Sequence, residues 1–229
     1  MSTLLCLHGA GCTNQVFEEQ RAAFPDLVAL NLPGHQSPGA PTSIEQFADG
    51  VEALVTQAGF RAVVLCGSSM GGAIALELSL RAPDWLRATV LIGSGSRLRV
   101  APQILERLES DFDGVCAELA AAFFAEPTPQ RVALATTLLH AIGPAQTKRD
   151  FLACNAFDVT ARLPEIRVPL LALVGEQDLM TPPKYAHQLA ARVPAARAEV
   201  IAGAGHLAML ERPCEVNDLL RAFVTEIKD

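Results

Sequence analysis

The stretch that decides the fold is AVVLCGSSMGGAIALELSL, residues 62–80. An apolar run leads into Gly-x-Ser-x-Gly, and a helical pattern follows it. That order is typical of a nucleophile elbow, a tight turn that joins a buried strand to a helix and exposes a strained serine. Only the frame flanked by Gly67 and Gly71 fits the motif. The pattern therefore predicts Ser69, and not Ser68, as a nucleophile at the N-terminus of a helix, where developing negative charge is favoured.

Similar apolar runs recur along the rest of the chain and alternate with helical patterns. None of them alternates polar with apolar residues, so we expect each to be a strand buried on both faces, as in a parallel sheet covered by helices. Ser43 and Gln46 have the spacing of a capping box for a helix over 43–58. The sequence predicts an α/β fold with a doubly wound, mostly parallel sheet of about six strands in the order 2-1-3-4-5-6. The runs are 62–66 and Thr3–Leu7, Leu27–Leu30, Ala88–Ile92, Leu170–Val174 and Ala198–Ile201.

One long stretch, residues 97–158, contains no credible strand. It has helical patterns over 115–125, 131–142 and 148–157, and the strand alternation resumes at Val168. The alternative is a set of extra helices packed against the sheet edge. We favour a helical insertion over the carboxyl ends of the strands, where such sheets bind ligands. The predicted organisation is a core over 1–96 and 159–229, interrupted by a helical cap at 97–158.

A serine nucleophile needs a base and an acid that orients it. Among the five histidines, His206 is the candidate base because it follows the last predicted strand in a Gly-Ala-Gly-His loop. Asp178, just past the strand that ends at Val174, is the candidate acid, and Glu176 is the competing carboxylate. The chain order Ser69, Asp178, His206 is that of serine hydrolases with this elbow.

Two backbone amides are needed to hold a developing oxyanion. One candidate is the amide of Met70, which follows the nucleophile. The other is Ala10, in His8-Gly9-Ala10-Gly11 after the first predicted strand. His8 itself is expected to brace that loop, since only one base is required. His140 and His187 are expected on the cap and on a surface helix.

Composition excludes several classes of protein. The chain has 229 residues, 50% of them hydrophobic, and a net charge of −7. These values exclude disorder and make a nucleic-acid surface improbable. No segment is long and apolar enough to span a bilayer, and the N-terminus does not resemble a signal peptide. The six cysteines have no CxxC or metal-ligand spacing, so we expect reduced thiols, no metal or organic cofactor, and a cytoplasmic protein of unknown oligomeric state.

On these motifs the sequence resembles the α/β-hydrolase superfamily over essentially its whole length. The resemblance implies a serine hydrolase that forms an acyl-enzyme on Ser69 and acts on small esters, lactones or thioesters. The matching segments are Leu7–Gly11, Leu32–His35, Gly67–Gly72, Gly175–Asp178 and Gly203–His206 running on to Pro213.

Departures from the family pattern narrow the expected function to a small esterase, lactonase or thioesterase. The chain opens on the family's usual third strand, and Asn31 and Gln36 replace the aspartate and second glycine of a segment beside the site. Ser69 in place of aspartate argues against haloalkane dehalogenases and epoxide hydrolases. Leu207 replaces the tryptophan common in carbon–carbon hydrolases, Ala10 replaces the aromatic of cofactor-free haloperoxidases and perhydrolases, and the Gly-Gly-Ser-Trp of proline iminopeptidases is absent.

Alternatives of other classes stay open. One is a carbon–carbon bond hydrolase or a menaquinone-pathway-type lyase that uses the same triad, and another is a non-catalytic small-molecule receptor or signalling partner. The lyase and carbon–carbon sites need cations for substrate carboxylates, and the cap region has Arg97, Arg99, Arg107, Arg131, Arg149 and Arg162. Apolar side chains there are candidates for the pocket lining: Leu98, Val100, Ile104, Phe112, Phe123, Phe124, Leu134, Leu138 and Phe151.

Overall fold

A single parallel sheet organises the chain. The computed structural model describes residues 2–35 and 39–227. Within these ranges the sheet has six strands in the order β2-β1-β3-β4-β5-β6, each parallel to its neighbours. This confirms the predicted fold class and strand order. The strands are β1 (Thr3–Leu7), β2 (Val28–Leu30), β3 (Val63–Ser68), β4 (Leu86–Ile92), β5 (Leu170–Gly175) and β6 (Ala196–Ile201).

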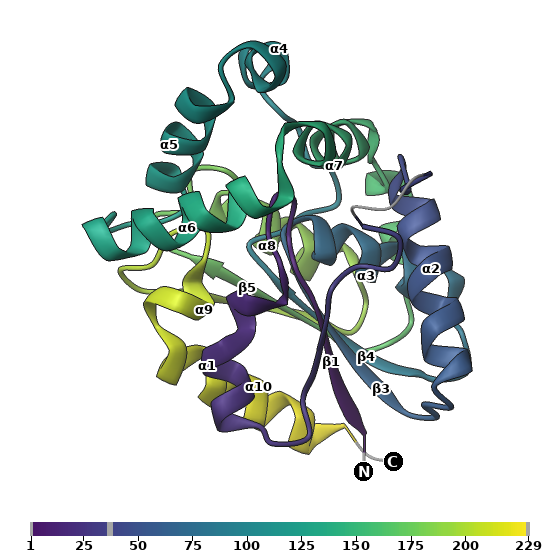
Figure 1. The fold of residues 1–229 in the computed structure, drawn as a ribbon. Helices are drawn as coiled ribbons and strands as arrows, with labels where there is room; N and C mark the ends of the chain where they lie inside the picture. Colours follow the sequence, from purple (N-terminus) through teal and green to yellow (C-terminus); the bar gives the residue numbers. More distant parts are fainter. Residues whose placement is uncertain (1, 36–38, 228–229) are drawn as a thin grey trace.

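Helices cover both faces of the sheet (Figure 1). On one face α1 (Glu18–Ala23) packs with α9 (Ala208–Glu211) and α10 (Pro213–Glu226). On the other face lie α2 (Ile44–Gln57), α3 (Met70–Arg81) and α8 (Pro183–Arg192). Short 3₁₀ turns, η1 (Asn14–Phe17) and η2 (Thr160–Glu165), complete the connections.

Between β4 and β5 the chain leaves the sheet and forms four helices, which we call the four-helix segment. They are α4 (Pro102–Ser110), α5 (Phe112–Ala122), α6 (Pro129–Ile142) and α7 (Pro144–Ala156). They lie together beyond one end of the sheet (Figure 1). The segment leaves and rejoins the core at one point, because Arg97 and Asp158 form an antiparallel bridge and Val159 N–H donates to the Ser96 carbonyl at 2.9 Å.

Local chemistry explains where several helices begin. The Ser43 hydroxyl accepts the Gln46 amide at α2, Asp111 accepts the Gly114 amide at α5, and Thr128 accepts the Arg131 amide at α6. Each of these side chains satisfies one of the amides that have no carbonyl partner in the first turn of a helix. Proline in the first turn of α4, α6 and α7 loses no helical hydrogen bond there.

The expectation that every strand is buried on both faces is wrong for the two edge strands. The central strands β3 and β5 are buried throughout. In β6 every residue before Ile201 is exposed or half-buried, and two residues of β2 are half-buried. Arg197 and Glu199 of β6 reach solvent. The predicted run began at Ala198, beyond the charged start of the strand, and an edge strand has a sheet neighbour on one side only.

Three further points from the sequence concern the cysteines, membrane-spanning segments and Gln36. Five of the cysteines are buried free thiols and Cys214 is an exposed one. None of the helices in the described ranges is both long enough and apolar enough to cross a membrane. Gln36, one of the departures from the family pattern, lies outside the described residues.

Candidate active site

The predicted site residues lie in loops at the carboxyl ends of four strands. Ala10 follows β1, Ser69 follows β3, Asp178 follows β5 and His206 follows β6. Because the strands are parallel, these ends meet at one edge of the sheet. Ser69, Ala10 and His206 all line one cavity, and Asp178 lies directly behind His206.

The turn at Ser69 has the geometry of a nucleophile elbow. The serine has φ 50° and ψ −113°, in a region that non-glycine residues seldom adopt. Close backbone contacts explain the flanking glycines: a Cβ on Gly67 would lie 2.2 Å from the Gly71 carbonyl oxygen, and a Cβ on Gly71 would lie 2.2 Å from the Leu7 carbonyl oxygen. The turn is held by Ser69 N–H donating to the Ile92 carbonyl and by the Ser94 hydroxyl donating to the Ser69 carbonyl.

The structure brings His206 and Asp178 together. His206 Nδ1 lies 2.9 Å from Asp178 Oδ2, and both side chains are almost wholly buried. The other carboxylate oxygen accepts the amides of Met180 and Thr181, each at 2.9 Å. Burial alone would raise the pKa of Asp178, but the charge of His206 and the hydrogen bonds from His206 and Thr181 outweigh it and lower the pKa to about 2. The acid is therefore ionised at neutral pH.

The second ring nitrogen of His206, Nε2, is available to accept a proton. It is buried and has no hydrogen-bond partner among the described residues. The imidazole stacks on Phe123, with ring centroids 6.0 Å apart. Such an orphaned ring nitrogen fits a base that awaits a proton from a neighbouring group.

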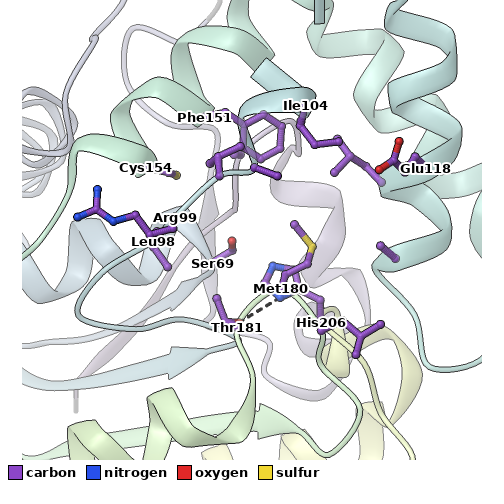
Figure 2. A pocket seen from close by; sticks show the side chains of 16 residues that line it. Ser69, Leu98, Arg99, Ile104, Glu118, Phe151, Cys154, Met180, Thr181 and His206 are labelled. Carbon is purple, nitrogen blue, oxygen red and sulfur yellow. Dashed lines mark hydrogen bonds between the residues drawn. The ribbon is translucent and has the colours of Figure 1, made fainter. Parts of the chain in front are cut away.

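Ser69 opens into a cavity of about 270 Å³ (Figure 2). Phe151 and Ile104 from the four-helix segment form one wall, and Met180, Thr181 and His206 from the sheet loops form the opposite wall. Of the nine apolar residues predicted as lining, four do line this cavity: Leu98, Val100, Ile104 and Phe151. Phe123 lines a small extension beside Ser69, while Phe112, Phe124, Leu134 and Leu138 line neither.

Charged groups are few in this cavity. Arg99 is the one predicted cation among its lining residues, and its guanidinium donates to the Asn155 carbonyl at 2.7 Å. Glu118 also lines the cavity and pairs with Arg107 at 2.7 Å. Apart from His206, none of the other lining residues has an acidic side chain or a Lys or Arg side chain. The arrangement fits an apolar ligand better than a highly charged one.

The two candidate oxyanion donors flank the nucleophile in the fold. Met70 is the first residue of α3, so its amide has no carbonyl partner one turn earlier in the helix. Ala10 lies in the loop after β1, and its neighbour Gly9 approaches Ser69 so closely that a Cβ there would lie 3.0 Å from the Ser69 Cβ.

The remaining histidines lie outside the cavity. His8 is fully buried, with Nδ1–H donating to the Gly9 carbonyl at 2.9 Å and Nε2 accepting the Leu32 amide at 3.2 Å. Burial lowers the pKa of His8 to about 4, so it is neutral at pH 7 and braces the loop. His140 and His187 are exposed.

Glu176, the competing carboxylate, accepts the Gly203 amide at 3.2 Å and is itself exposed. It has no contact with His206 among the hydrogen bonds of the described residues. The geometry therefore favours Asp178 as the acid.

Sequence reasoning missed three polar residues that position the site. The Thr181 hydroxyl donates to Asp178 Oδ2 at 2.7 Å, and it lies three residues after the acid. The buried carboxylate of Glu211 accepts the amide of Gly205, next to His206, and the amides of Ala125 and Glu126 in the four-helix segment. Asp150, the third, lies on α7 and accepts the Gly11 amide. Thr181 is close in sequence to its partner, but nothing local in the sequence indicates the partners of Asp150.

No group of three or more His, Cys, Asp or Glu side chains in the described part of the chain is arranged to hold a metal ion.

Comparisons with known proteins agree with this architecture. A family model described as the alpha/beta hydrolase family matches residues 4–219. The chain is 30% identical over 245 residues to a pimeloyl-[acyl-carrier protein] methyl ester esterase of Neisseria meningitidis, covering 97% of this chain and 77% of that protein. It is also 30% identical to part of the polyketide synthase ThaQ of Burkholderia thailandensis, where the match spans 97% of this chain but 12% of the synthase.

A solved structure of a thermophilic esterase superimposes with a TM-score of 0.86 at 29% identity, covering 98% of this chain and 90% of that one. The family match spans nearly the whole sheet and all the loops that hold Ala10, Ser69, Asp178 and His206. The chain therefore belongs to the alpha/beta hydrolase family.

Proposed function

We propose that this protein hydrolyses carboxylic esters, or the related lactones and thioesters, through an acyl-enzyme on Ser69. The observation that carries the proposal is the buried Asp178–His206 pair, whose orphaned Nε2 shares one cavity with the serine of a strained elbow. The esterases among the similar proteins support the same reaction class.

In the proposed first half-reaction, Ser69 Oγ attacks the carbonyl carbon while His206 Nε2 takes its proton. The ionised Asp178 holds the imidazole in one tautomer and stabilises the imidazolium. The amides of Ala10 and Met70 donate to the oxyanion, and each such donor contributes about 2.7–4 kcal/mol to lowering the barrier.

Collapse of the tetrahedral intermediate then breaks the bond to the alcohol oxygen or thiol sulfur, which leaves with the proton from His206; in a lactone the new hydroxyl stays attached to the acyl chain. In the second half-reaction the same imidazole takes a proton from water, and the resulting hydroxide attacks the acyl-enzyme. The acid leaves and Ser69 recovers its proton. The nucleophile, the base, the acid and the oxyanion donors in these steps all belong to this chain, and water is the second reactant.

We propose a small acyl group, short or medium in length and mainly apolar, as the preferred substrate portion. Apolar side chains make up most of the cavity wall, and a cavity of about 270 Å³ is at the small end for ligand pockets. Each buried methylene is worth about 0.8 kcal/mol until the space is filled. Catalytic efficiency should therefore rise with acyl length to a maximum and then fall.

We further propose that residues 97–158 act as a cap between the core segments 1–96 and 159–229. Its two ends meet at the Arg97–Asp158 bridge, and its helices supply Ile104 and Phe151 to the cavity wall. In this role the cap selects the acyl group and performs no chemistry. We also propose a cytoplasmic location, which the free cysteine thiols support.

A second candidate is a carbon–carbon hydrolase or lyase that reads a substrate carboxylate. The observation that favours it is that one arginine, Arg99, is among the residues that line the cavity. Against it stand the apolar character of the wall and the engagement of Arg99 with Asn155. We therefore rank ester hydrolysis first.

A panel of p-nitrophenyl esters from C2 to C12, run beside γ-lactones, acyl-thioesters and matched substrates with a terminal carboxylate, tests the proposal. The expected result is turnover of uncharged esters that Ser69→Ala abolishes to near the solution rate. Ser68→Ala is the matched control, since the Ser68 hydroxyl is buried next to the elbow and does not line the cavity. Activity confined to the carboxylate series, or no activity on any member, would overturn ester hydrolysis as the function.

A further inference from the structure

A second buried carboxylate–imidazole pair lies behind the candidate oxyanion loop. Asp150 on α7 is fully buried, and its Oδ2 accepts His35 Nε2–H at 2.9 Å and the Gly11 amide at 3.1 Å. Its other oxygen accepts from Gln146 at 2.8 Å. The pair joins three segments that are distant in sequence: the loop after β1, the loop after β2 and the four-helix segment.

Hydrogen bonds hold both of the peptide planes that flank Ala10. The Gly9 carbonyl accepts His8 Nδ1–H at 2.9 Å and the Cys12 amide at 3.3 Å. Since the Gly9–Ala10 peptide is planar and trans, fixing that carbonyl fixes the opposite direction for the Ala10 N–H. The next peptide, Ala10–Gly11, is fixed at its own N–H by Asp150.

The backbone at Gly11 depends on the four-helix segment in a second way. Gly11 has φ +64°, and a Cβ there would lie 2.6 Å from Leu139 of α6. The helices α6 and α7 therefore pack directly on the loop while α7 supplies its hydrogen-bond acceptor. His35 also packs against His8, with ring centroids 5.1 Å apart, so the groups that hold the two peptide planes are in contact.

We propose that Asp150, supported by His35, is a positioning residue for the oxyanion hole. It reaches from α7 to the loop after β1 and fixes the Ala10–Gly11 peptide at the Gly11 amide, so that, together with the His8 and Cys12 bonds to the Gly9 carbonyl, it keeps the Ala10 amide in the direction that the reaction needs. In this arrangement the four-helix segment does more than shape the cavity, because it supplies part of the rigid frame of the catalytic machinery. The inference rests on the proposed function, since it gives the Ala10 amide a role in acyl transfer.

The consequence is a defect in transition-state stabilisation rather than in substrate binding. Without the acceptor, the Gly11 amide has no partner and the loop can rotate its peptides. Removing an oxyanion donor altogether costs about 10²–10³ in kcat, and displacing catalytic groups by about 1 Å from a distance costs up to about 10². We expect Asp150→Ala to lower kcat at least about tenfold, with little change in KM.

The decisive readout is the affinity for a trifluoromethyl ketone. Ser69 Oγ would add to its carbonyl, His206 would take the proton, and the resulting hemiketal oxyanion would depend on the same two amides. The inhibition constant of Asp150→Ala should rise by the same factor by which kcat/KM falls. Val115→Ala is the matched control, because it removes a buried contact within the four-helix segment away from the cavity and the loop. It should lower the melting temperature and leave both constants unchanged.

A pair of His35 variants covers the case in which Asp150→Ala does not fold. His35→Leu removes the donor, whereas His35→Gln keeps an N–H near the carboxylate. We expect a loss of kcat and inhibitor affinity in the leucine variant and partial recovery in the glutamine variant.

Folded Asp150 and His35 variants with a lower melting temperature but an unchanged inhibition constant and kcat would overturn the inference and leave ester hydrolysis intact. A wild-type protein that neither hydrolyses esters nor binds the ketone would overturn the proposed function, and the inference with it.

Discussion

Residues 2–35 and 39–227 contain two buried carboxylate–imidazole pairs with the same heavy-atom distance. Asp178 and His206 are 2.9 Å apart, and so are Asp150 and His35. In the first pair the carboxylate binds Nδ1, which leaves Nε2 orphaned beside the cavity that Ser69 lines. In the second pair the carboxylate binds Nε2 and shares the same oxygen with the Gly11 amide.

The difference shows that the pair itself does not define a catalytic site. What matters is where the rest of the ring and the rest of the carboxylate are directed. The second carboxylate oxygen of Asp178 accepts the amides of Met180 and Thr181 from its own loop, and its ring partner His206 lines the cavity. Asp150 accepts one hydrogen bond from Gln146 within α7 and two from other segments, at Gly11 and His35, and so connects those segments. We therefore propose that the first pair moves a proton and that the second holds a backbone segment.

The largest expected effect separates the two pairs directly. Asp178→Asn permits the wrong tautomer of His206 and should lower kcat by up to about four orders of magnitude. Asp150→Asn keeps one acceptor oxygen for the loop and should cost far less, about tenfold at most. Steady-state kinetics on one p-nitrophenyl ester measures both variants. Equal losses of kcat in Asp178→Asn and Asp150→Asn would contradict the different roles of the two pairs. A larger loss for Glu176→Gln than for Asp178→Asn would mean that the acid is misassigned.

The second prediction concerns the pH dependence of stability, and it applies to His8, which braces the loop after β1. The pKa of His8 is lowered by burial to about 4, whereas an unfolded histidine has a pKa of about 6.5. Between these values the unfolded chain binds a proton that the folded chain does not, so the free energy of unfolding falls as the pH drops from about 6.5 to 4. The loss reaches at most about 3 kcal/mol.

Urea unfolding measured across this pH range, in a Ser69→Ala background, tests that prediction. His8→Gln removes the titrating group and should flatten the dependence. Asp178 acts at lower pH: its lowered pKa of about 2 means that its contribution to stability is complete above about pH 4 and is lost as the pH falls toward 2. A curve that keeps its slope between pH 6.5 and 4 in the His8 variant would assign the effect to another group.

The smallest expected effect belongs to Arg99. Arg99 is one of the lining residues, but its guanidinium is directed away from the space beside Ser69 (Figure 2), donates to the Asn155 carbonyl and belongs to a side chain that is about half exposed. Arg99→Ala should change kcat/KM for uncharged esters by less than about threefold, since an exposed charge contributes little. An assay of the same variant on substrates with a terminal carboxylate tests whether Arg99 binds that carboxylate. A loss confined to that series, together with a preference of the wild type for it, would move the function toward the carboxylate-reading class.

Sequence patterns predicted the core of this fold well because its signals are local. The Gly-x-Ser-x-Gly turn, the apolar runs of the central strands and the order of the loops after them are each readable within a few residues. The strand order followed from general rules on how parallel strands are connected. The predicted order already placed β6 at the edge of the sheet, and only its burial was misjudged, because burial depends on which distant segments pack against the strand and that is not a local property.

The second pair escaped prediction for the same reason. His35 was visible in a family segment and Asp150 in a helical pattern, but they are 115 residues apart in sequence. The Gly11 amide that Asp150 accepts is 139 residues away. No periodicity or spacing indicates such a meeting, because it depends on how the four-helix segment folds back over the sheet. The helix α4 that begins this segment was not among the helical patterns taken from the sequence, although its buried Ile104 and Leu108 have helical spacing.

The central claim is that Ser69 is the nucleophile of an acyl-transfer site, and a covalent adduct tests it most directly. The intact protein would be treated with a fluorophosphonate, digested and mapped by mass spectrometry. The account predicts one adduct per chain, on Ser69, formed much more slowly in Asp178→Asn and absent from Ser69→Ala. An adduct on Ser68, or no adduct on a folded protein, would contradict it.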